Sequence, residues 1–302
     1  MSAKTLWTMA EAREEVGPSV CVVGVIGSPV AHSLSPLLHN AAFDAVGLGG
    51  QWHSFAFDVP PGAAHTALTQ VAEYDLTGIS VTMPHKEAVA DLVGECSAVA
   101  QRLRAVNCVH NRDGALFGTN TDGEGFVASL ARGAGFAPGG RRCLVAGAGG
   151  AARAVVLALA QAGAAEVAVV NRTVERAVSA AALAGAAGSV VKEGIEEAVA
   201  RADLVVNATP VGMVEPVTRQ PAGRGARLWS IDPTLLHEGQ VAADLVYAPR
   251  PTDWLVRAAL RGAVTVDGLG MLVHQAAAQL ELWTGRPVPV AAMWEAVETT
   301  GT

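Results

Sequence analysis

The chain has 302 residues, 51% of them hydrophobic, which is enough for two domains with filled cores and excludes a disordered chain. Its formal net charge of -7 argues against a nucleic-acid or anionic-membrane surface. No apolar run is long enough to span a bilayer, the first residues lack a targeting pattern, and the four cysteines are too scattered for a disulfide framework or a metal site. We therefore expect a cytoplasmic monomer or homodimer without a metal, whose partner is a small molecule.

A pair of serines follows the first Val-rich segment. Residues 20–26 predict a strand, and Ser33, Ser35 and Pro36 come soon after it. Because proline suits the first turn of a helix, both hydroxyls fall beside a helix start, where an anion is favoured. This corner could bind a carboxylate, or the serines could only cap the helix.

A second polar corner follows the strand expected at residues 76–81. Thr82 ends the strand, and Lys86 opens the next helix. The chain has only two other lysines, Lys4 and Lys192. A lysine can give and take a proton, whereas an arginine effectively cannot, so Lys86 is a candidate for proton transfer. The alternative is a solvated lysine, although the helix dipole disfavours a cation there.

A third corner contains an amide and a carboxylate. Residues 105–110 predict a strand that includes Asn107, and Asp122 precedes a helix expected at residues 124–131. Asp122 could cap that helix or belong to a site. The glycine-rich residues 132–140 are expected to link two domains.

Around residue 147 the sequence predicts a strand, a tight glycine turn and a helix in succession. The turn fits G-x-G-x-x-G/A, in which backbone amides approach a pyrophosphate and the helix start stabilises the anion. The alternative is an ordinary turn between a strand and a helix. The expected cofactor contacts here are Gly147, Ala148, Gly149, Gly150 and Ala151.

The end of the next strand, residues 166–170, favours NADP over NAD. Asn171, Arg172 and Thr173 stand roughly 20 residues beyond the turn, where dinucleotide folds read the adenosine ribose. An acid would bind a free 2′-hydroxyl, whereas these residues offer donors and a positive charge that suit a 2′-phosphate. Otherwise Arg172 is a solvated arginine.

The remaining chain continues the alternation of an α/β protein. Strands are expected at residues 203–207, 228–232, 241–246 and 264–268, and a long helix at residues 271–284.

In order and spacing, these motifs strongly resemble the shikimate dehydrogenase family over residues 20–290. The matching segments are residues 33–36, 81–86, 105–107, 120–123, the glycine turn, 171–173, 244–247 and 268–276. The resemblance implies reversible NADP-dependent reduction of 3-dehydroshikimate to shikimate, a step of aromatic amino-acid biosynthesis. It also implies an α/β substrate-binding domain, residues 1–126 completed by 269–302, and a Rossmann-type doubly wound NADP-binding domain, residues 127–268.

The resemblance further assigns roles to single residues. The catalytic pair would be Lys86 and Asp122. The substrate carboxylate would be bound by Ser33 and Ser35. Around the ring hydroxyls would stand Thr82, Asn107, Tyr247 and Gln275. Further cofactor contacts would be Thr209, Met213 and Gly268.

Some positions depart from the family pattern and leave the accepted polyol open between shikimate, quinate and aminoshikimate. Ser80 replaces a common asparagine, Arg104 a glycine and Cys108 a threonine, and Pro210-Val211 replaces a small polar pair. These residues lie near the expected substrate and nicotinamide positions.

Two other classes of protein remain as alternatives. A non-catalytic metabolite-sensing homologue would normally have lost Lys86 or Asp122, and both are present. A methylenetetrahydrofolate dehydrogenase or a glutamyl-tRNA reductase would not explain the paired serines.

Overall fold

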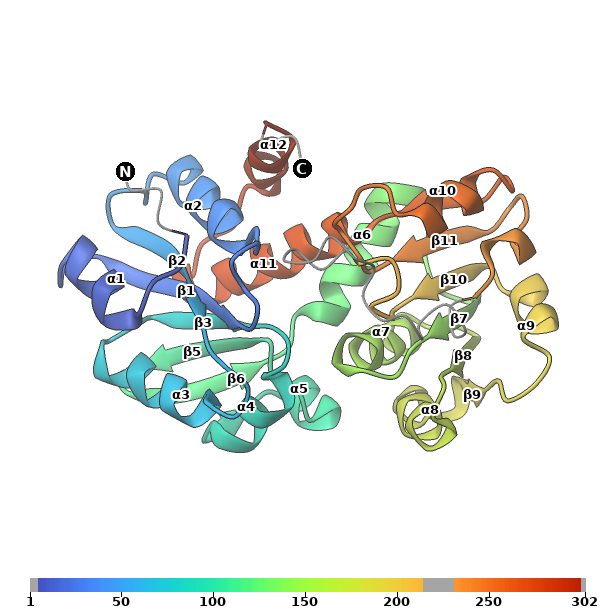
Figure 1. Cartoon of the computed structure of the whole chain (residues 1–302), viewed down its shortest axis with the longest axis horizontal. Helices are drawn as coiled ribbons and strands as arrows, with labels where there is room; N and C mark the ends of the chain where they lie inside the picture. The colour runs from blue at the N-terminus through green and yellow to red at the C-terminus, as the bar shows by residue number, and fades with distance from the viewer. Residues whose placement is uncertain (1–4, 214–230, 300–302) are drawn as a thin grey trace. The chain divides into compact units, whose positions relative to one another are not determined.

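The structure is a computed structural model that describes residues 5–213 and 231–299. The chain forms two compact units. One consists of the described parts of Met1–Thr121 and Gln275–Gly301, and the other of the described parts of Asp122–His274. Each unit is a six-stranded sheet with helices on both faces, so the predicted α/β class is confirmed (Figure 1).

The sheet of the first unit has the order β2-β1-β3-β5-β6-β4. Strands β1 to β3 are parallel, and β5 runs antiparallel to both β3 and β6. Asp113 and Gly114 close the β5–β6 hairpin with φ of 52° and 90°, as its two-residue turn requires. The strands are β1 (Cys21–Gly27), β2 (Trp52–Asp58), β3 (Gly78–Val81), β4 (Glu95–Cys96), β5 (Cys108–Arg112) and β6 (Ala115–Thr119).

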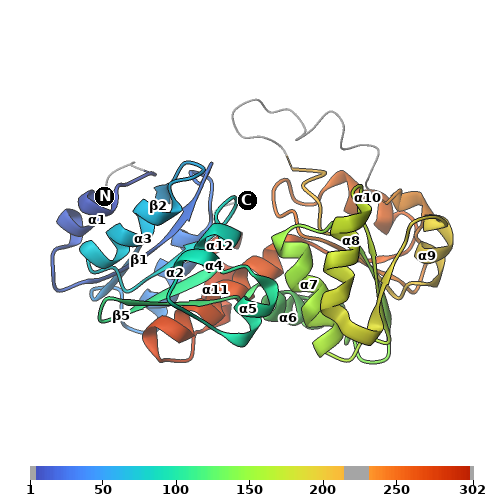
Figure 2. The ribbon, with the colours of Figure 1, turned by 90° about the horizontal axis from the view of Figure 1, so that it is seen from below.

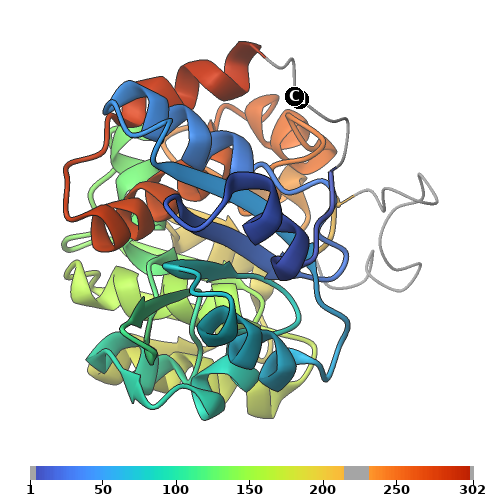
Figure 3. The ribbon, with the colours of Figure 1, turned by 90° about the vertical axis from the view of Figure 1, so that its left-hand side faces the viewer.

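Alternate side chains of β2 point to opposite faces of this sheet. Phe55 and Phe57 pack in a core with α1 (Met9–Val16), α3 (Ala64–Glu73), α4 (Lys86–Leu92) and α5 (Ala98–Leu103). Ser54 points the other way, to α2 (Ser35–Ala45). Helix α12 (Val290–Thr299) runs beside α2, as the dark red and light blue helices of Figure 3 show.

The strand expected at residues 105–110 begins only at Cys108. The backbone N–H of Ala105 bonds to the Ala100 carbonyl and that of Val106 to the Lys86 carbonyl, so both amides are used by helices instead of a sheet. Asn107 therefore stands at the entrance of β5 and not within it.

The second unit has an entirely parallel sheet of order β12-β11-β10-β7-β8-β9. This is the strand order of a dinucleotide-binding doubly wound fold, with its switch point between β7 and β10. The strands are β7 (Arg142–Ala146), β8 (Glu166–Val170), β9 (Gly188–Val190), β10 (Leu204–Asn207), β11 (Val241–Asp244) and β12 (Val264–Val266).

Helices cover both faces of this second sheet. Figure 2 shows α7 (Gly150–Gln161) and α8 (Val174–Ala181) side by side, as right-handed crossovers on one face require. Side chains of α9 (Ile195–Arg201) and α10 (Asp253–Ala259) pack on the other face. A short 3-10 helix, η1 (Ala182–Ala187), precedes β9.

Two helices differ from the expected bounds. Helix α6 (Asp122–Ala134) begins at Asp122, which is its first residue and not its cap, and it extends into the expected linker. Helix α11 (Gly268–Thr284) begins three residues before the expected 271. None of the described helices has the length and apolar character needed to cross a bilayer.

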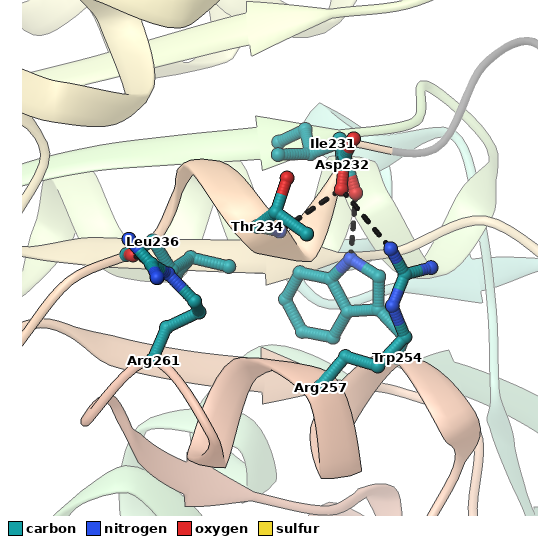
Figure 4. Close-up of polar contacts among 7 residues, drawn as sticks. All are labelled: Ile231, Asp232, Thr234, Leu236, Trp254, Arg257 and Arg261. Atoms are coloured by element: carbon teal, nitrogen blue, oxygen red, sulfur yellow. Dashed lines mark hydrogen bonds and ion pairs between the residues drawn. The ribbon is translucent and has the colours of Figure 1, made fainter.

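The segment after the undescribed residues 214–230 is fastened to α10 (Figure 4). The Trp254 indole N–H donates to the Ile231 carbonyl at 2.7 Å, and Asp232 Oδ1 accepts from the Thr234 backbone N–H at 2.9 Å. Of the strand expected at residues 228–232, residues 228–230 lie outside the described chain. Ile231 and Asp232 are not in a strand, because they lead into the 3-10 turn η3 (Pro233–Leu235).

Candidate active site

In the first unit, buried amide and hydroxyl side chains meet beside the start of β5. The Oδ1 of Asn107 accepts from the Thr121 backbone N–H at 2.8 Å, and its Nδ2 donates to Gln275 Oε1 at 3.3 Å. Thr121 Oγ1 donates to the Gln275 carbonyl at 3.1 Å. The structure thus brings Asn107 and Gln275, two residues singled out in the sequence, into direct contact although 168 positions separate them.

Lys86 and Thr82 lie at the corner between β3 and α4. Lys86 is half-buried, and its carbonyl accepts the Val106 backbone N–H at 2.9 Å, which ties this corner to the residue before Asn107. The Thr82 backbone N–H donates to the Ile26 carbonyl at 2.9 Å, so the chain segments that leave β3 and β1 are neighbours. Side chains at the carboxyl ends of adjacent parallel strands are well placed to share a ligand.

The serine corner follows β1. Ser35 is buried at the first position of α2, and its backbone N–H donates to Ser33 Oγ at 3.3 Å. The N-cap residue is Leu34, so neither serine occupies the cap itself. Within the unit, this corner leaves the same end of the sheet as Thr82.

Helix α2 is fixed to β2 one turn beyond the serines. Asn40 Oδ1 accepts from the Ser54 backbone N–H at 2.9 Å, and Asn40 Nδ2 donates to the Ser54 carbonyl at 3.1 Å. His39 Nδ1 lies 2.9 Å from Ser54 Oγ, and burial lowers the His39 pKa to about 3, so the ring is neutral. These contacts hold the start of α2, and with it the two hydroxyls.

In the second unit, the glycine turn follows β7 at the switch point. Gly147 has φ of 119°, and an added Cβ would lie 2.6 Å from the Ala208 carbonyl oxygen, so only glycine fits. Gly149 is the N-cap of α7 and has no side-chain cap, while Gly150 and Ala151 form the first turn. Ala148 is buried and Ala152 is fully so. The turn leaves backbone amides of the helix start for an anion.

The corner after β10 is held by a buried carboxyl. Asn207 Nδ2 donates to Asp244 Oδ1 at 3.0 Å, and Thr209 Oγ1 donates to Asn207 Oδ1 at 2.6 Å. The second oxygen of Asp244 accepts from Thr252 Oγ1 at 2.7 Å. Burial raises the Asp244 pKa to about 6, against the lowering effect of these donors. This network orients the segment from Thr209 to Met213, which contains Pro210-Val211.

Tyr247 and Gly268 lie near the end of β11 in the same unit. Burial raises the pKa of the Tyr247 phenol, which therefore stays protonated at neutral pH. The Gly268 backbone N–H lies 3.3 Å from the Val246 carbonyl, and a Cβ there would overlap the Leu245 carbonyl. The close approach explains why a glycine opens α11.

Asn171, Arg172 and Thr173 form the turn between β8 and α8. Asn171 Nδ2 donates to the Thr173 carbonyl at 3.0 Å, and Arg172 and Thr173 are exposed. Within the described residues, no carboxylate forms an ion pair with the Arg172 guanidinium. An exposed arginine that no described carboxylate pairs with suits an anion.

The predicted site residues are distributed over the two units. The first unit contains Ser33, Ser35, Thr82, Lys86, Asn107 and Gln275. The second contains Asp122, which is 4% exposed at the start of α6, Tyr247, and all the expected cofactor residues. Sequence reasoning missed Gln279, Thr121 and Asn207 as members of these networks. Gln279 could have been found, because it lies four residues after Gln275 on the same helix face.

Three family models match the chain in succession. Residues 25–109 match the shikimate dehydrogenase substrate binding domain, residues 134–220 match shikimate / quinate 5-dehydrogenase, and residues 268–298 match the shikimate 5'-dehydrogenase C-terminal domain.

Known proteins match nearly the whole chain. A shikimate dehydrogenase (NADP(+)) of Moorella thermoacetica is 45% identical, over 92% of this chain and 93% of its own. The crystal structure of shikimate 5-dehydrogenase from Thermus thermophilus in complex with NADP(H) and shikimate is 38% identical, with a TM-score of 0.79 over 93% of this chain and 99% of that one. Quinate dehydrogenase from Corynebacterium glutamicum, in complex with NAD, is 31% identical, with a TM-score of 0.78 over 93% of this chain and 99% of its own. The chain therefore belongs to the shikimate dehydrogenase family.

Proposed function

We propose that this chain catalyses the reversible NADP-dependent reduction of 3-dehydroshikimate to shikimate. The observation that carries the proposal is the buried contact between Asn107 and Gln275, tied through Val106 to the lysine corner. A cyclic polyol offers hydroxyl groups to such amides. The 45% identical relative named for this reaction supports the same substrate.

Lys86 supplies the proton in this proposal. Reduction of a ring ketone puts negative charge on its oxygen, and an ammonium group both stabilises that charge and hands over a proton. General acid catalysis of this kind contributes roughly 10²- to 10⁴-fold. In the oxidation direction the neutral amine accepts the proton. Asp122 is the proposed second member of the catalytic pair.

The other side chains of the first unit recognise the substrate. The hydroxyls of Ser33 and Ser35 bind the carboxylate, since they flank a helix start that favours an anion. The ring hydroxyls are bound by Thr82, Asn107 and Gln275. Tyr247 of the second unit, whose buried phenol stays protonated, is proposed as a further substrate-binding residue. In this proposal, selection of the substrate follows from the match between these donors and acceptors and the hydroxyl pattern of the ring.

The second unit has the features that NADP requires. Gly147 lacks room for a side chain, the α7 start has no side-chain cap, and Arg172 is an exposed cation. When bound, NADP supplies or accepts the hydride. The pyrophosphate is bound by the turn from Gly147 to Ala151, the 2′-phosphate by Asn171, Arg172 and Thr173, and the nicotinamide side by Thr209, Met213 and Gly268.

We assign the first unit as the substrate-binding domain and the second as the NADP-binding domain. The boundaries expected at residues 126 and 268 fall in α6 and α11, the two helices at which the chain divides into its units. A cytoplasmic location belongs to the same proposal, supported by four cysteines that are all free thiols. The proposed oligomeric state is a monomer or a homodimer.

Quinate is the second candidate substrate, since the quinate dehydrogenase covers the same length of chain. Initial rates of NADPH and NADH oxidation with 3-dehydroshikimate and with 3-dehydroquinate separate the possibilities. We expect kcat/KM for NADPH with 3-dehydroshikimate to exceed every other pair by about tenfold or more. A preference for 3-dehydroquinate and NADH would replace the proposed function, and absence of turnover with all four pairs would refute it.

A further inference from the structure

Ser80 and Gln279 extend the Asn107 cluster to residues that carry no assigned role. Ser80 lies on β3 and is 5% exposed, and Gln279 lies on α11 and is fully buried. Although 199 positions separate the two residues, Ser80 Oγ donates a hydrogen bond to Gln279 Oε1. Gln279 Nε2 donates to Gln275 Oε1 at 2.7 Å and to the Asn107 carbonyl at 3.2 Å. A buried glutamine is costly unless its amide is satisfied, and this one is.

Two backbone groups fix the orientation of all three amides in the cluster. The Asn107 carbonyl can only accept, so the Gln279 atom that faces it is the nitrogen, and Oε1 is turned to Ser80. The Thr121 backbone N–H can only donate, so the Asn107 atom that faces it is the oxygen. Asn107 and Gln279 consequently both present nitrogen to Gln275, whose facing atom must be its oxygen.

This polarity decides what Gln275 offers to a ligand. Its Oε1 accepts two hydrogen bonds inside the cluster, so the polar atom that the amide offers to a ligand is its Nε2 donor. We propose that Gln279, held by Ser80, is a positioning residue that fixes Gln275 with its N–H donors directed to a ring hydroxyl oxygen of the substrate. The inference rests on the proposed function. It gives a purpose to Ser80, one of the departures from the family pattern.

Gln279→Glu tests the polarity directly. The ionised carboxylate of this variant offers only acceptors. A charge-assisted bond from the Gln275 nitrogen to it outweighs the 3.3 Å bond from Asn107 Nδ2 to Gln275 Oε1, so Gln275 rotates its nitrogen inward and presents its carbonyl oxygen to the substrate. When the introduced carboxyl is protonated, its O–H donates to Gln275 Oε1 and the parental orientation returns. We expect the Kd of shikimate, measured by isothermal titration of the full chain, to rise about tenfold at high pH and to approach the parental value as the pH falls. The Kd of NADP should change less than about twofold over the same range.

Gln240 offers a matched control in the second unit. It is 1% exposed, and its Nε2 donates to the Val199 and Ala202 carbonyls, both at 2.7 Å. Gln240→Glu also places a carboxyl in a buried glutamine site, but it should leave the Kd of shikimate unchanged at every pH. If Gln279→Glu does not fold, Gln279→Met removes the donor without a charge, and shikimate binding should then weaken by about fivefold without a pH dependence.

The outcomes separate the two proposals. A parental chain that binds NADP but not shikimate refutes the proposed function, and the role of Gln279 with it. Two results refute only the positioning role, provided that the parental chain binds shikimate. In the first, the Gln279 variants bind shikimate as tightly as the parent. In the second, they lose equal affinity for NADP and for shikimate. A pH-dependent loss confined to shikimate in Gln279→Glu supports that role.

Discussion

The polar cluster of the first unit and the glycine turn of the second are both suited to binding, but they are built differently. Around Asn107, side chains from distant segments contact one another through hydrogen bonds that each pair one donor with one acceptor. Around Gly147, backbone approaches backbone so closely that no side-chain atom fits. The first region is sensitive to the exchange of one donor for an acceptor, whereas the second is sensitive to the addition of a single carbon.

The largest expected effect concerns proton transfer in the first unit. Lys86→Ala, and Lys86→Arg nearly as much, should lower kcat by about 10²-fold or more with a smaller change in KM, because arginine keeps the charge but cannot exchange the proton. Steady-state kinetics with shikimate and NADP measure both constants. A Lys86→Arg enzyme with parental kcat would reduce Lys86 to a purely electrostatic role.

The next effect concerns Asp244, the buried carboxyl that holds the corner after β10 in the second unit. The folded pKa of Asp244 is about 6, above the ordinary 3.8, so the native state binds the proton more tightly than the unfolded state. The contribution of this carboxyl to the free energy of unfolding therefore falls as pH rises from about 4 to about 6, by up to about 3 kcal/mol.

Asp244→Asn should remove this pH dependence, because an amide of the same shape does not titrate. Urea unfolding of parent and variant at several pH values between about 4.5 and 7 gives the difference in stability. The free energy of unfolding of the variant should increase relative to that of the parent as the pH rises. Parallel stability curves over this range would show that the Asp244 carboxyl does not titrate there.

A smaller effect is expected at the ribose end of the cofactor. Arg172→Ala should lower the ratio of kcat/KM for NADP over NAD by about tenfold, because the charge acts only on the 2′-phosphate. Exposure of Arg172 and screening by salt limit the loss, so the ratio is compared at one ionic strength. An unchanged ratio would make Arg172 a surface residue without a role in cofactor choice.

The same contrast explains how far the sequence could predict the molecule. The strand, turn and helix around Gly147 could be predicted because their signals lie in one short stretch of sequence, and the structure places β7 before the turn and α7 after it. The serine corner and Lys86 were also found locally, each at the start of a helix. The bond between Ser80 and Gln279 depends on a partner 199 residues away, which no local pattern contains. The late start of β5 depends on one partner outside the local sequence, the Lys86 carbonyl that accepts from the Val106 amide, and on one nearby, the Ala100 carbonyl that accepts from the Ala105 amide.

The most direct test measures whether shikimate binding and NADP binding can each be weakened without a change in the other. Shikimate and NADP are titrated in turn into the parent, Ser35→Ala and Gly147→Val. Ser35→Ala should weaken shikimate binding by roughly 1.5 to 3 kcal/mol, which is the contribution of a hydrogen bond to a charged group, and leave NADP binding unchanged. Gly147→Val should weaken NADP binding by roughly 1 to 3 kcal/mol through backbone strain and leave shikimate binding unchanged. Equal losses of both ligands in either folded variant would contradict the assignment of one ligand to each unit.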